Sequence, residues 1–208
     1  AGWSGARSEV AGCGRAAPGP SRIIRPMEHF DAIIVGAGAA GLFCAARAGQ
    51  QGLRVLLLDH SDRIAEKIRI SGGGRCNFTN RDAGPANYLS DNPRFARSAL
   101  SRYTPADFIA LVQRHRIAFH EKHKGQLFCD HSAEDIIAML LRENEAGGVV
   151  RRQPCGVRGI RRSEGETPRF ELDTDAGPVA APRLVIATGG LPVPAIGATD
   201  FGLKVAQQ

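Results

Sequence analysis

Short apolar runs and amphipathic stretches alternate along most of this chain. Residues 32–35, 54–59 and 183–187 contain aliphatic runs typical of strands that are buried on both faces of a parallel sheet. Helix-forming composition or an apolar helical face predicts helices at residues 42–48, 94–102, 106–115, 132–145 and 201–208. Strands that alternate with helices in this way predict an α/β fold.

Shorter β-type segments complete the expected architecture. We expect strands at residues 117–120, 126–129 and 149–150, and antiparallel strands at residues 157–161, 170–174 and 179–181 with turns at 163–167 and 175–178. The last three form a small meander, whereas residues 149–150 continue the parallel sheet. The predicted fold class is therefore α/β, a Rossmann-like domain with a doubly wound parallel sheet and a small antiparallel β-meander.

The first 26 residues differ from the rest of the chain. They are rich in Gly, Ala, Arg, Ser and Pro and show little apolar periodicity, so we expect a disordered leader before a domain at residues 27–208. The leader lacks the apolar core of a secretory signal and is only distantly similar to a mitochondrial transit peptide. A translated upstream region, with Met27 as the natural start, is the favoured interpretation.

Charge, cysteines and hydropathy restrict the classes of partner. The net charge is +6, but Arg7, Arg15, Arg22 and Arg25 against Glu9 account for +3, which leaves +3 for residues 27–208. We therefore expect no nucleic-acid partner. Five cysteines without CxxC or His/Cys ligand spacing predict a reducing, cytoplasmic setting and no metal site, and no apolar run is long enough to cross a membrane.

The most specific local motif joins the first strand to the first helix. It reads Gly36-Ala37-Gly38-Ala39-Ala40-Gly41, and Asp59 ends the next strand 18 positions after Gly41. In dinucleotide-binding folds the first glycine permits the turn, the second lets a diphosphate approach the backbone, and the third lets helix and strand pack closely. The acidic residue binds a ribose hydroxyl. Asp59 disfavours NADP, although the neighbouring His60 and Arg63 weaken that exclusion.

A second cluster of glycines and polar residues follows. The candidate cofactor-binding residues here are Lys67, Ser71, Gly72, Gly73, Gly74, Arg75, Cys76 and Asn77. Three consecutive glycines are entropically costly, and they are useful where a ligand touches the backbone or a positive φ is required. We interpret the segment as a loop around a cofactor, with a flexible surface loop as the alternative. Cys76 is interpreted as a packing residue rather than a redox nucleophile, because no partner lies in CxxC spacing.

Glycines also follow the strand at residues 183–187. Thr188, Gly189 and Gly190 come directly after that strand, at the edge where open α/β sheets bind ligands. These three residues are therefore further candidates for cofactor contact.

Four strings in order make the chain resemble a known family. DAIIVGAGAAGL, KIRISGGGRCNFTN, GQLFCDHSAEDI and LVIATGGLPVPAIGATDFG are similar to the bacterial BaiN/YhiN-like, aminoacetone-oxidase-type flavoproteins. The resemblance implies FAD, with NAD(P)H as a possible electron donor, and places Val157 near the adenine. Members of that family are about twice as long, with an insertion domain and a C-terminal segment that returns to the flavin. We therefore expect an incomplete FAD-binding domain.

The leading functional hypothesis is a flavin-dependent oxidoreductase that acts on a small organic molecule. Its chemistry would be that of an NAD(P)H-linked reductase or an oxidase, carried by the flavin. Arg75, Asn77 and Asp200 are candidate pocket residues, but no proton-transfer pair is evident. Two alternatives stay open, a non-catalytic dinucleotide-binding module and an NAD-dependent dehydrogenase without flavin. An RNA-modifying role has little support from the mild charge, and the sequence leaves the substrate and oligomeric state open.

Overall fold

Four parallel strands form the central sheet of the computed structural model, which describes residues 26–164, 169–193 and 197–207. In sheet order they are β11 (Leu184–Ile186), β2 (Ala32–Val35), β3 (Val55–Leu58) and β7 (Val150–Arg152). Their parallel pairing, for example Ile33 with Leu56, confirms the predicted sheet. β11 is only partly buried, in contrast to the expected buried strand, because it lies at the edge of the described sheet.

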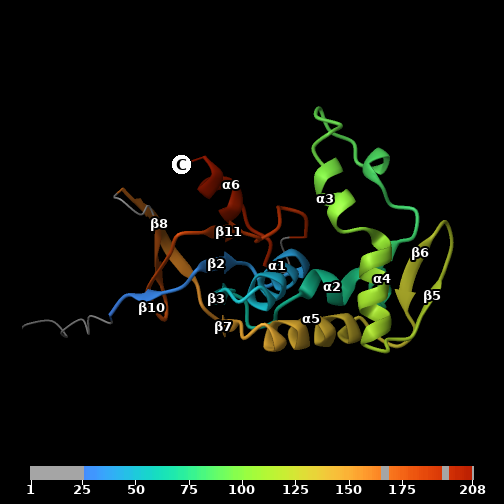
Figure 1. Cartoon of the computed structure of the whole chain (residues 1–208), viewed down its shortest axis with the longest axis horizontal. Coiled ribbons are helices and arrows are strands. Elements are labelled where there is room, and N and C mark those ends of the chain that lie inside the picture. Colours follow the sequence, from blue (N-terminus) through green and yellow to red (C-terminus); the bar gives the residue numbers. More distant parts are fainter. Residues whose placement is uncertain (1–25, 165–168, 194–196, 208) are drawn as a thin grey trace, which may run out of the picture.

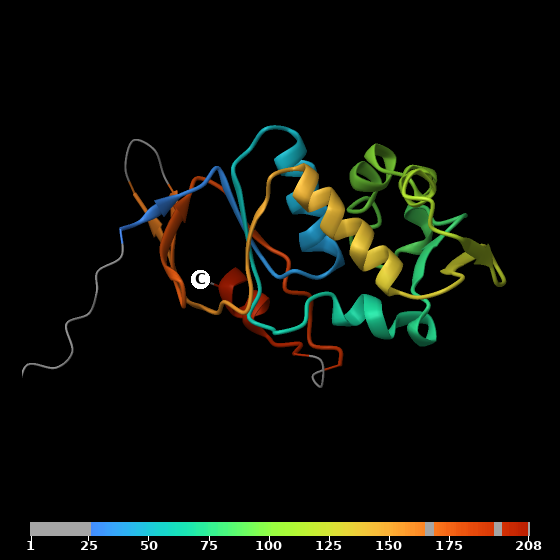
Figure 2. The ribbon, with the colours of Figure 1, turned by 90° about the horizontal axis from the view of Figure 1, so that it is seen from below.

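The two faces of this sheet are covered by different kinds of structure. Ile34, Val55 and Leu57 point toward helices α1 (Ala39–Gln50) and α5 (Glu134–Ala146), which lie side by side to the right of the sheet (Figures 1 and 2). Ile33, Leu56 and Leu58 point the other way, toward the meander. Burial on both faces explains why β2 and β3 are continuous apolar runs.

The meander on the second face has the predicted antiparallel order. It consists of β8 (Val157–Ser163), β9 (Arg169–Thr174) and β10 (Gly177–Ala181). A two-residue strand that the sequence did not indicate, β1 (Glu28–His29), adds to β10 in parallel. The predicted turn at 163–167 falls partly outside the described residues, and so does almost all of the predicted leader.

A separate three-stranded sheet lies beyond the ends of α1 and α5 (Figure 1). Its order is β4 (Asn77–Asn80), β6 (Gln126–Cys129) and β5 (Phe119–Glu121), all antiparallel. The sequence predicted β5 and β6, but treated residues 77–80 as loop. That part of the prediction is wrong, because a polar strand is accommodated at the edge of a sheet where its side chains remain partly exposed.

The glycine-rich segment is also more regular than a loop. Helix α2 (Glu66–Ile70) leads into the 3-10 turn η1 (Ser71–Gly74), in which Gly72 and Gly73 have φ of 59° and 68°. The prediction of an irregular loop is therefore wrong for residues 66–74, whereas the prediction that these glycines need positive φ is correct. A further 3-10 turn, η2 (Pro85–Asn87), and helix α3 (Arg97–Arg102) follow β4.

The remaining helices among the described residues differ in how they begin, and of these only α4 has a capping box. At α4 (Pro105–Arg114), Thr104 Oγ1 accepts a hydrogen bond from the Asp107 amide at 3.3 Å, and the Asp107 carboxylate accepts one from the Thr104 amide at 2.7 Å. At α5, Ser132 Oγ instead accepts from the Glu134 amide. Helix α6 (Phe201–Ala206) lies beside β11 (Figure 1). None of the helices in the described ranges is long and apolar enough to cross a membrane.

Candidate functional site

A cavity of about 870 Å³ opens at the carboxyl ends of the central strands. Val35, Asp59 and Ala187, at or just beyond the ends of β2, β3 and β11, lie on its lining. Cofactor and small-molecule sites occupy roughly 300–1,000 Å³, and open α/β sheets place them at this edge. The cavity therefore has the position and size of a cofactor site.

Most of the predicted cofactor residues meet in this cavity, although they come from four separate stretches of sequence. The lining includes Gly36, Gly38, Ala39, Ala40, Asp59, His60, Lys67, Ser71, Cys76, Asn77, Val157, Thr188, Gly189 and Gly190. Seven of the predicted residues are not on it: Ala37, Gly41, Gly72, Gly73, Gly74, Arg75 and Asp200.

The three glycines of the first motif have different surroundings. A Cβ at Gly41 would lie 1.7 Å from the carbonyl oxygen of Gly36, and a Cβ at Gly36, where φ is 106°, would lie 2.5 Å from the carbonyl oxygen of Ala187. A Cβ at Gly38 would meet nothing within 4 Å. Gly36 and Gly41 are thus required by the fold itself, whereas Gly38 leaves open space beside the backbone at the start of α1.

That open space adjoins the amino end of a helix. Gly38 is the N-cap of α1, makes no side-chain cap hydrogen bond, and is followed by no acidic residue in the first turn. Free amide groups at a helix N-terminus, with the helix dipole behind them, attract anionic groups. The residues present fit the diphosphate of a dinucleotide.

Asp59 holds the motif turn in place. One carboxylate oxygen accepts a hydrogen bond from the Ala37 amide at 2.6 Å, and the other accepts one from the Ser61 amide at 2.8 Å. His60 Nδ1 lies 3.8 Å from the same carboxylate. The side chain is largely buried yet borders the cavity, so its predicted contact with a ribose hydroxyl stays a prediction.

The α2 side of the cavity supplies positive charge. Lys67 is exposed on the lining and makes no ion pair within the described part of the chain. Arg69 does not contribute, because Glu66 and Glu134 bind its guanidinium. Arg75 is exposed off the lining, where its carbonyl oxygen accepts a hydrogen bond from the Cys129 amide at 2.9 Å.

Cys76 and Cys129 are buried thiols. Burial raises the pKa of Cys76, against an opposing hydrogen bond with Ser71, and burial together with the neighbouring Cys76 raises the pKa of Cys129 to about 12. A thiol with a raised pKa is a poor nucleophile. The geometry agrees with the packing role predicted for Cys76.

An apolar wall that sequence reasoning missed encloses the far end of the cavity. It is formed by Phe43, Phe78, Phe108, Ile136 and Leu140, which come from α1, β4, α4 and α5. Phe78 and Phe108 have ring centroids 6.1 Å apart, and Phe43 and Phe108 6.4 Å. These rings exclude water from that end and suit a planar, apolar ring system.

The β11 side ends in an unsatisfied hydroxyl. Thr188 Oγ1 is buried, borders the cavity, and has no hydrogen-bond partner among the described residues. Because buried hydroxyls are nearly always paired, this atom is a candidate contact for a bound molecule. Asp200, which precedes α6, instead pairs with Lys204 Nζ at 3.0 Å, and its proposed pocket role receives no support from its position.

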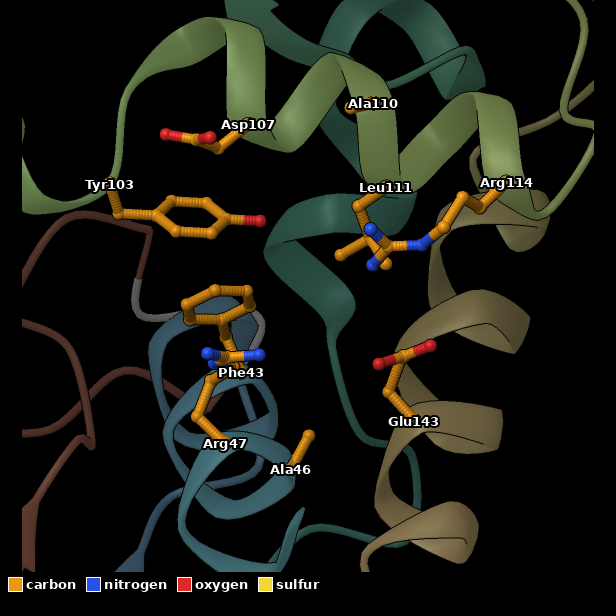
Figure 3. A pocket seen from close by; sticks show the side chains of 9 residues that line it. All are labelled: Phe43, Ala46, Arg47, Tyr103, Asp107, Ala110, Leu111, Arg114 and Glu143. Carbon is orange, nitrogen blue, oxygen red and sulfur yellow. The ribbon is translucent and has the colours of Figure 1, made fainter. Parts of the chain in front are cut away.

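A second, smaller cavity of about 140 Å³ lies between α1, α4 and α5 (Figure 3). The rings of Tyr103 and Phe43 are tilted at 58° with centroids 4.8 Å apart, and Phe43 lines both this cavity and the larger one. Glu143 lies 2.7 Å from both Gln50 Nε2 and His115 Nε2. Burial alone would raise the pKa of Glu143, but these hydrogen bonds outweigh it and leave the pKa below its ordinary value.

The described residues contain no cluster of His, Cys, Asp or Glu able to hold a metal ion.

Comparison with known proteins places the chain in a family. Residues 30–208 match the HI0933-like protein Rossmann domain. The chain is 54% identical over 182 residues to the ribosomal RNA dihydrouridine synthase of Escherichia coli (strain K12), covering 88% of this chain and 45% of that protein. It is 26% identical over 180 residues to the 3-dehydro-bile acid delta(4,6)-reductase of Clostridium scindens, covering 84% and 42%.

Solved structures support the same fold. The glycine oxidase of Geobacillus kaustophilus superposes with a TM-score of 0.55 at 17% identity, covering 86% of this chain and 59% of that one. The chain spans less than half the length of the two curated relatives named above. With a Rossmann-like sheet, a cofactor-sized cavity and a family match over residues 30–208, the chain belongs to the HI0933-like protein Rossmann-domain family.

Proposed function

We propose that this chain binds FAD in the larger cavity and forms the cofactor-binding part of an enzyme that reduces uridine to dihydrouridine in ribosomal RNA. The observation that carries the FAD site is the convergence of Gly38, Asp59, Lys67 and Thr188 on one cavity of about 870 Å³. The RNA substrate rests on the 54% identity to a ribosomal RNA dihydrouridine synthase across 88% of the chain. Relatives at that level commonly share chemistry, so this substrate is preferred over the small molecule expected from sequence.

The chain's own residues have distinct roles in this proposal. The open backbone at Gly38 and the amino end of α1 bind the diphosphate, and Lys67 adds a cation on the same cavity. Asp59 keeps the motif turn in shape through the Ala37 amide and presents oxygen atoms toward the ribose. Thr188 Oγ1 donates to a cofactor oxygen and so satisfies a hydroxyl that otherwise has no partner.

The apolar wall has a separate function. Phe43, Phe78 and Phe108 cover the ring end of the cavity and keep water away from the site of electron transfer. When bound, FAD supplies the hydride chemistry that saturation of a uracil C5–C6 bond requires. Because saturation of that bond is a reduction that consumes two electrons, NAD(P)H is the proposed electron donor.

A second candidate substrate is a small organic molecule with a conjugated double bond. It is favoured by the apolar wall and by the 26% identity to a bile-acid reductase. The two candidates share the FAD site and the electron donor, and they differ in what approaches the flavin.

The test uses the whole chain supplied with FAD and NADPH. It is incubated either with unmodified transcribed ribosomal RNA or with a steroid enone, and mass spectrometry of the products follows. Dihydrouridine supports the proposal, whereas reduction of the enone alone supports the second candidate. Failure to bind FAD overturns both. Gly38→Val, which adds bulk where the structure has free space, is the matched control expected to abolish product with either substrate.

A further inference from the structure

Residues 81–103 carry an unusual combination of exposed apolar and basic side chains. They connect β4 to α4 and project from the molecule at the end farthest from the meander (Figure 1). Leu89 is 97% exposed, Phe95 81% and Tyr88 54%. Large apolar side chains exposed together on a soluble fold mark an interaction surface.

The charge of the same segment is locally positive. Arg94, Arg97 and Arg102 are exposed, and no acidic residue occurs between Asn92 and Thr104. None of the three arginines forms an ion pair within the ranges that the structure describes, in contrast to Arg81, which pairs with Glu121 at 3.2 Å. Three unneutralised guanidinium groups beside exposed aromatic rings fit a polyanion that also offers rings for stacking.

The surface is connected to the large cavity through aromatic contacts. Tyr103 follows α3 and its ring packs at a tilt against Phe43, which borders that cavity. Arg47 and Arg114 face the small cavity at this junction (Figure 3) and form no ion pair with any described residue. Tyr103 therefore joins the end of this segment to Phe43, a residue of the apolar wall.

Building on the function proposed above, we propose that residues 88–102 form a docking surface for unpaired RNA. Tyr88 and Phe95 stack on splayed bases, and Arg94, Arg97 and Arg102 contact the phosphates. An enzyme that reduces a base must hold it outside the duplex, so a surface for unpaired nucleotides beside the cavity meets that need. The low net charge of residues 27–208 does not conflict with this role, because binding depends on local charge.

The experiment measures RNA binding separately from catalysis. The whole chain is titrated against a fluorescein-labelled, unstructured, uridine-containing RNA of about 12 nucleotides, followed by anisotropy over a series of salt concentrations. Phe95→Ala is expected to raise the Kd about fivefold or more, and Phe95→Tyr to restore it. Arg97→Gln is expected to reduce the slope of log K against log salt by about 1.

Matched controls lie on other parts of the molecule. Leu203→Ala removes an exposed apolar side chain from α6, and Arg161→Gln removes an exposed arginine from β8 at the opposite end. Both should bind RNA as the unchanged chain does. Equal binding by all variants overturns the docking surface, as does a chain that binds no RNA. The docking surface is also overturned if Phe95→Ala abolishes self-association in sedimentation experiments but leaves RNA binding unchanged, because the surface would then bind a second copy of the chain.

The outcomes also separate this inference from the proposed function. If dihydrouridine forms but RNA binding is unchanged in Phe95→Ala and Arg97→Gln, the docking surface alone is contradicted. RNA binding that depends on those residues, without any dihydrouridine, contradicts the proposed reaction alone.

Discussion

The three glycines of one motif should respond differently to the same substitution. At Gly41 an alanine Cβ would lie 1.7 Å from a backbone oxygen, and at Gly36 it would lie 2.5 Å from one while φ is 106°. Overpacking costs about 1–3 kcal/mol, so Gly41→Ala, with the closest approach, should destabilise the chain by about 3 kcal/mol. At Gly36 the unfavourable φ adds about 1–3 kcal/mol to the overpacking, so Gly36→Ala should cost about 3 kcal/mol or more. At Gly38 the added methyl group meets no atom, and the loss in stability should stay within about 1 kcal/mol.

Substitution of Gly38 should affect FAD affinity much more than it affects stability. The same methyl group stands where the diphosphate must approach the backbone, so Gly38→Ala should weaken FAD binding about tenfold or more, or about 1.4 kcal/mol. Urea unfolding followed by circular dichroism gives the stabilities, and flavin fluorescence titration gives the affinities. Gly159→Ala, on β8 and equally free of close neighbours, is the control for both. The reasoning is refuted if Gly38→Ala binds FAD normally, or if it destabilises the chain as much as Gly41→Ala does.

Three further predictions test other parts of the site. Thr188→Val should leave the FAD-free stability unchanged or slightly higher, because it removes an unpaired buried hydroxyl, but should weaken FAD binding by about 1 kcal/mol in the same titration; unchanged affinity would argue against a cofactor contact. Because the pKa of Glu143 is lowered, its stabilising effect is present above the ordinary value of 4.5 and is lost as the pH falls through the folded-state pKa. Urea unfolding should therefore show Glu143→Gln about 1–2 kcal/mol less stable at pH 7, with the difference shrinking at acid pH; a constant difference would contradict the assignment. Cys129, buried and with its pKa raised to about 12, should resist thiol reagents at pH 8 until urea unfolds the chain, and rapid labelling of the native chain would contradict that environment.

The features that the sequence predicted best are those that depend on local steric limits or on the spacing of apolar residues. The parallel strands were evident because burial on both faces requires continuous apolar runs, as in β2 and β3. The roles of Gly36 and Gly41 were evident because close backbone approach at a strand–turn–helix leaves no room for a Cβ. The helix predicted at residues 106–115 is present one residue earlier, as α4 (Pro105–Arg114), because its apolar face packs against the core.

The features that were missed depend on tertiary structure. The apolar wall combines Phe43, Phe78 and Phe108, which are distant in sequence and look like ordinary core residues. The segment around Ser71–Gly74 was taken for a loop because glycine indicates permissive backbone but not whether that backbone forms a 3-10 turn. Arg75 was proposed for the pocket from its neighbours in sequence, yet it is exposed and not on the lining, whereas Cys76 and Asn77 directly after it are.

Net charge was a poor guide to the proposed partner. The charge of +3 over residues 27–208 argued against nucleic acid, and that expectation has not been tested. A sum over the chain conceals the arginines at 94, 97 and 102, which outnumber the single carboxylate of residues 88–102, Asp91, and form no ion pair with any described residue. Their location became meaningful only once the fold placed Tyr103, which follows α3, against Phe43 on the cavity lining.

The most direct test of the central claim is the visible spectrum of the purified 208-residue chain before and after addition of FAD, followed by release and identification of the ligand. The account predicts a protein-bound flavin spectrum, release of FAD on denaturation, and loss of most of that binding in Gly38→Ala at nearly unchanged stability. A well-folded chain that stays colourless with excess FAD would contradict the assignment of the 870 Å³ cavity as the cofactor site.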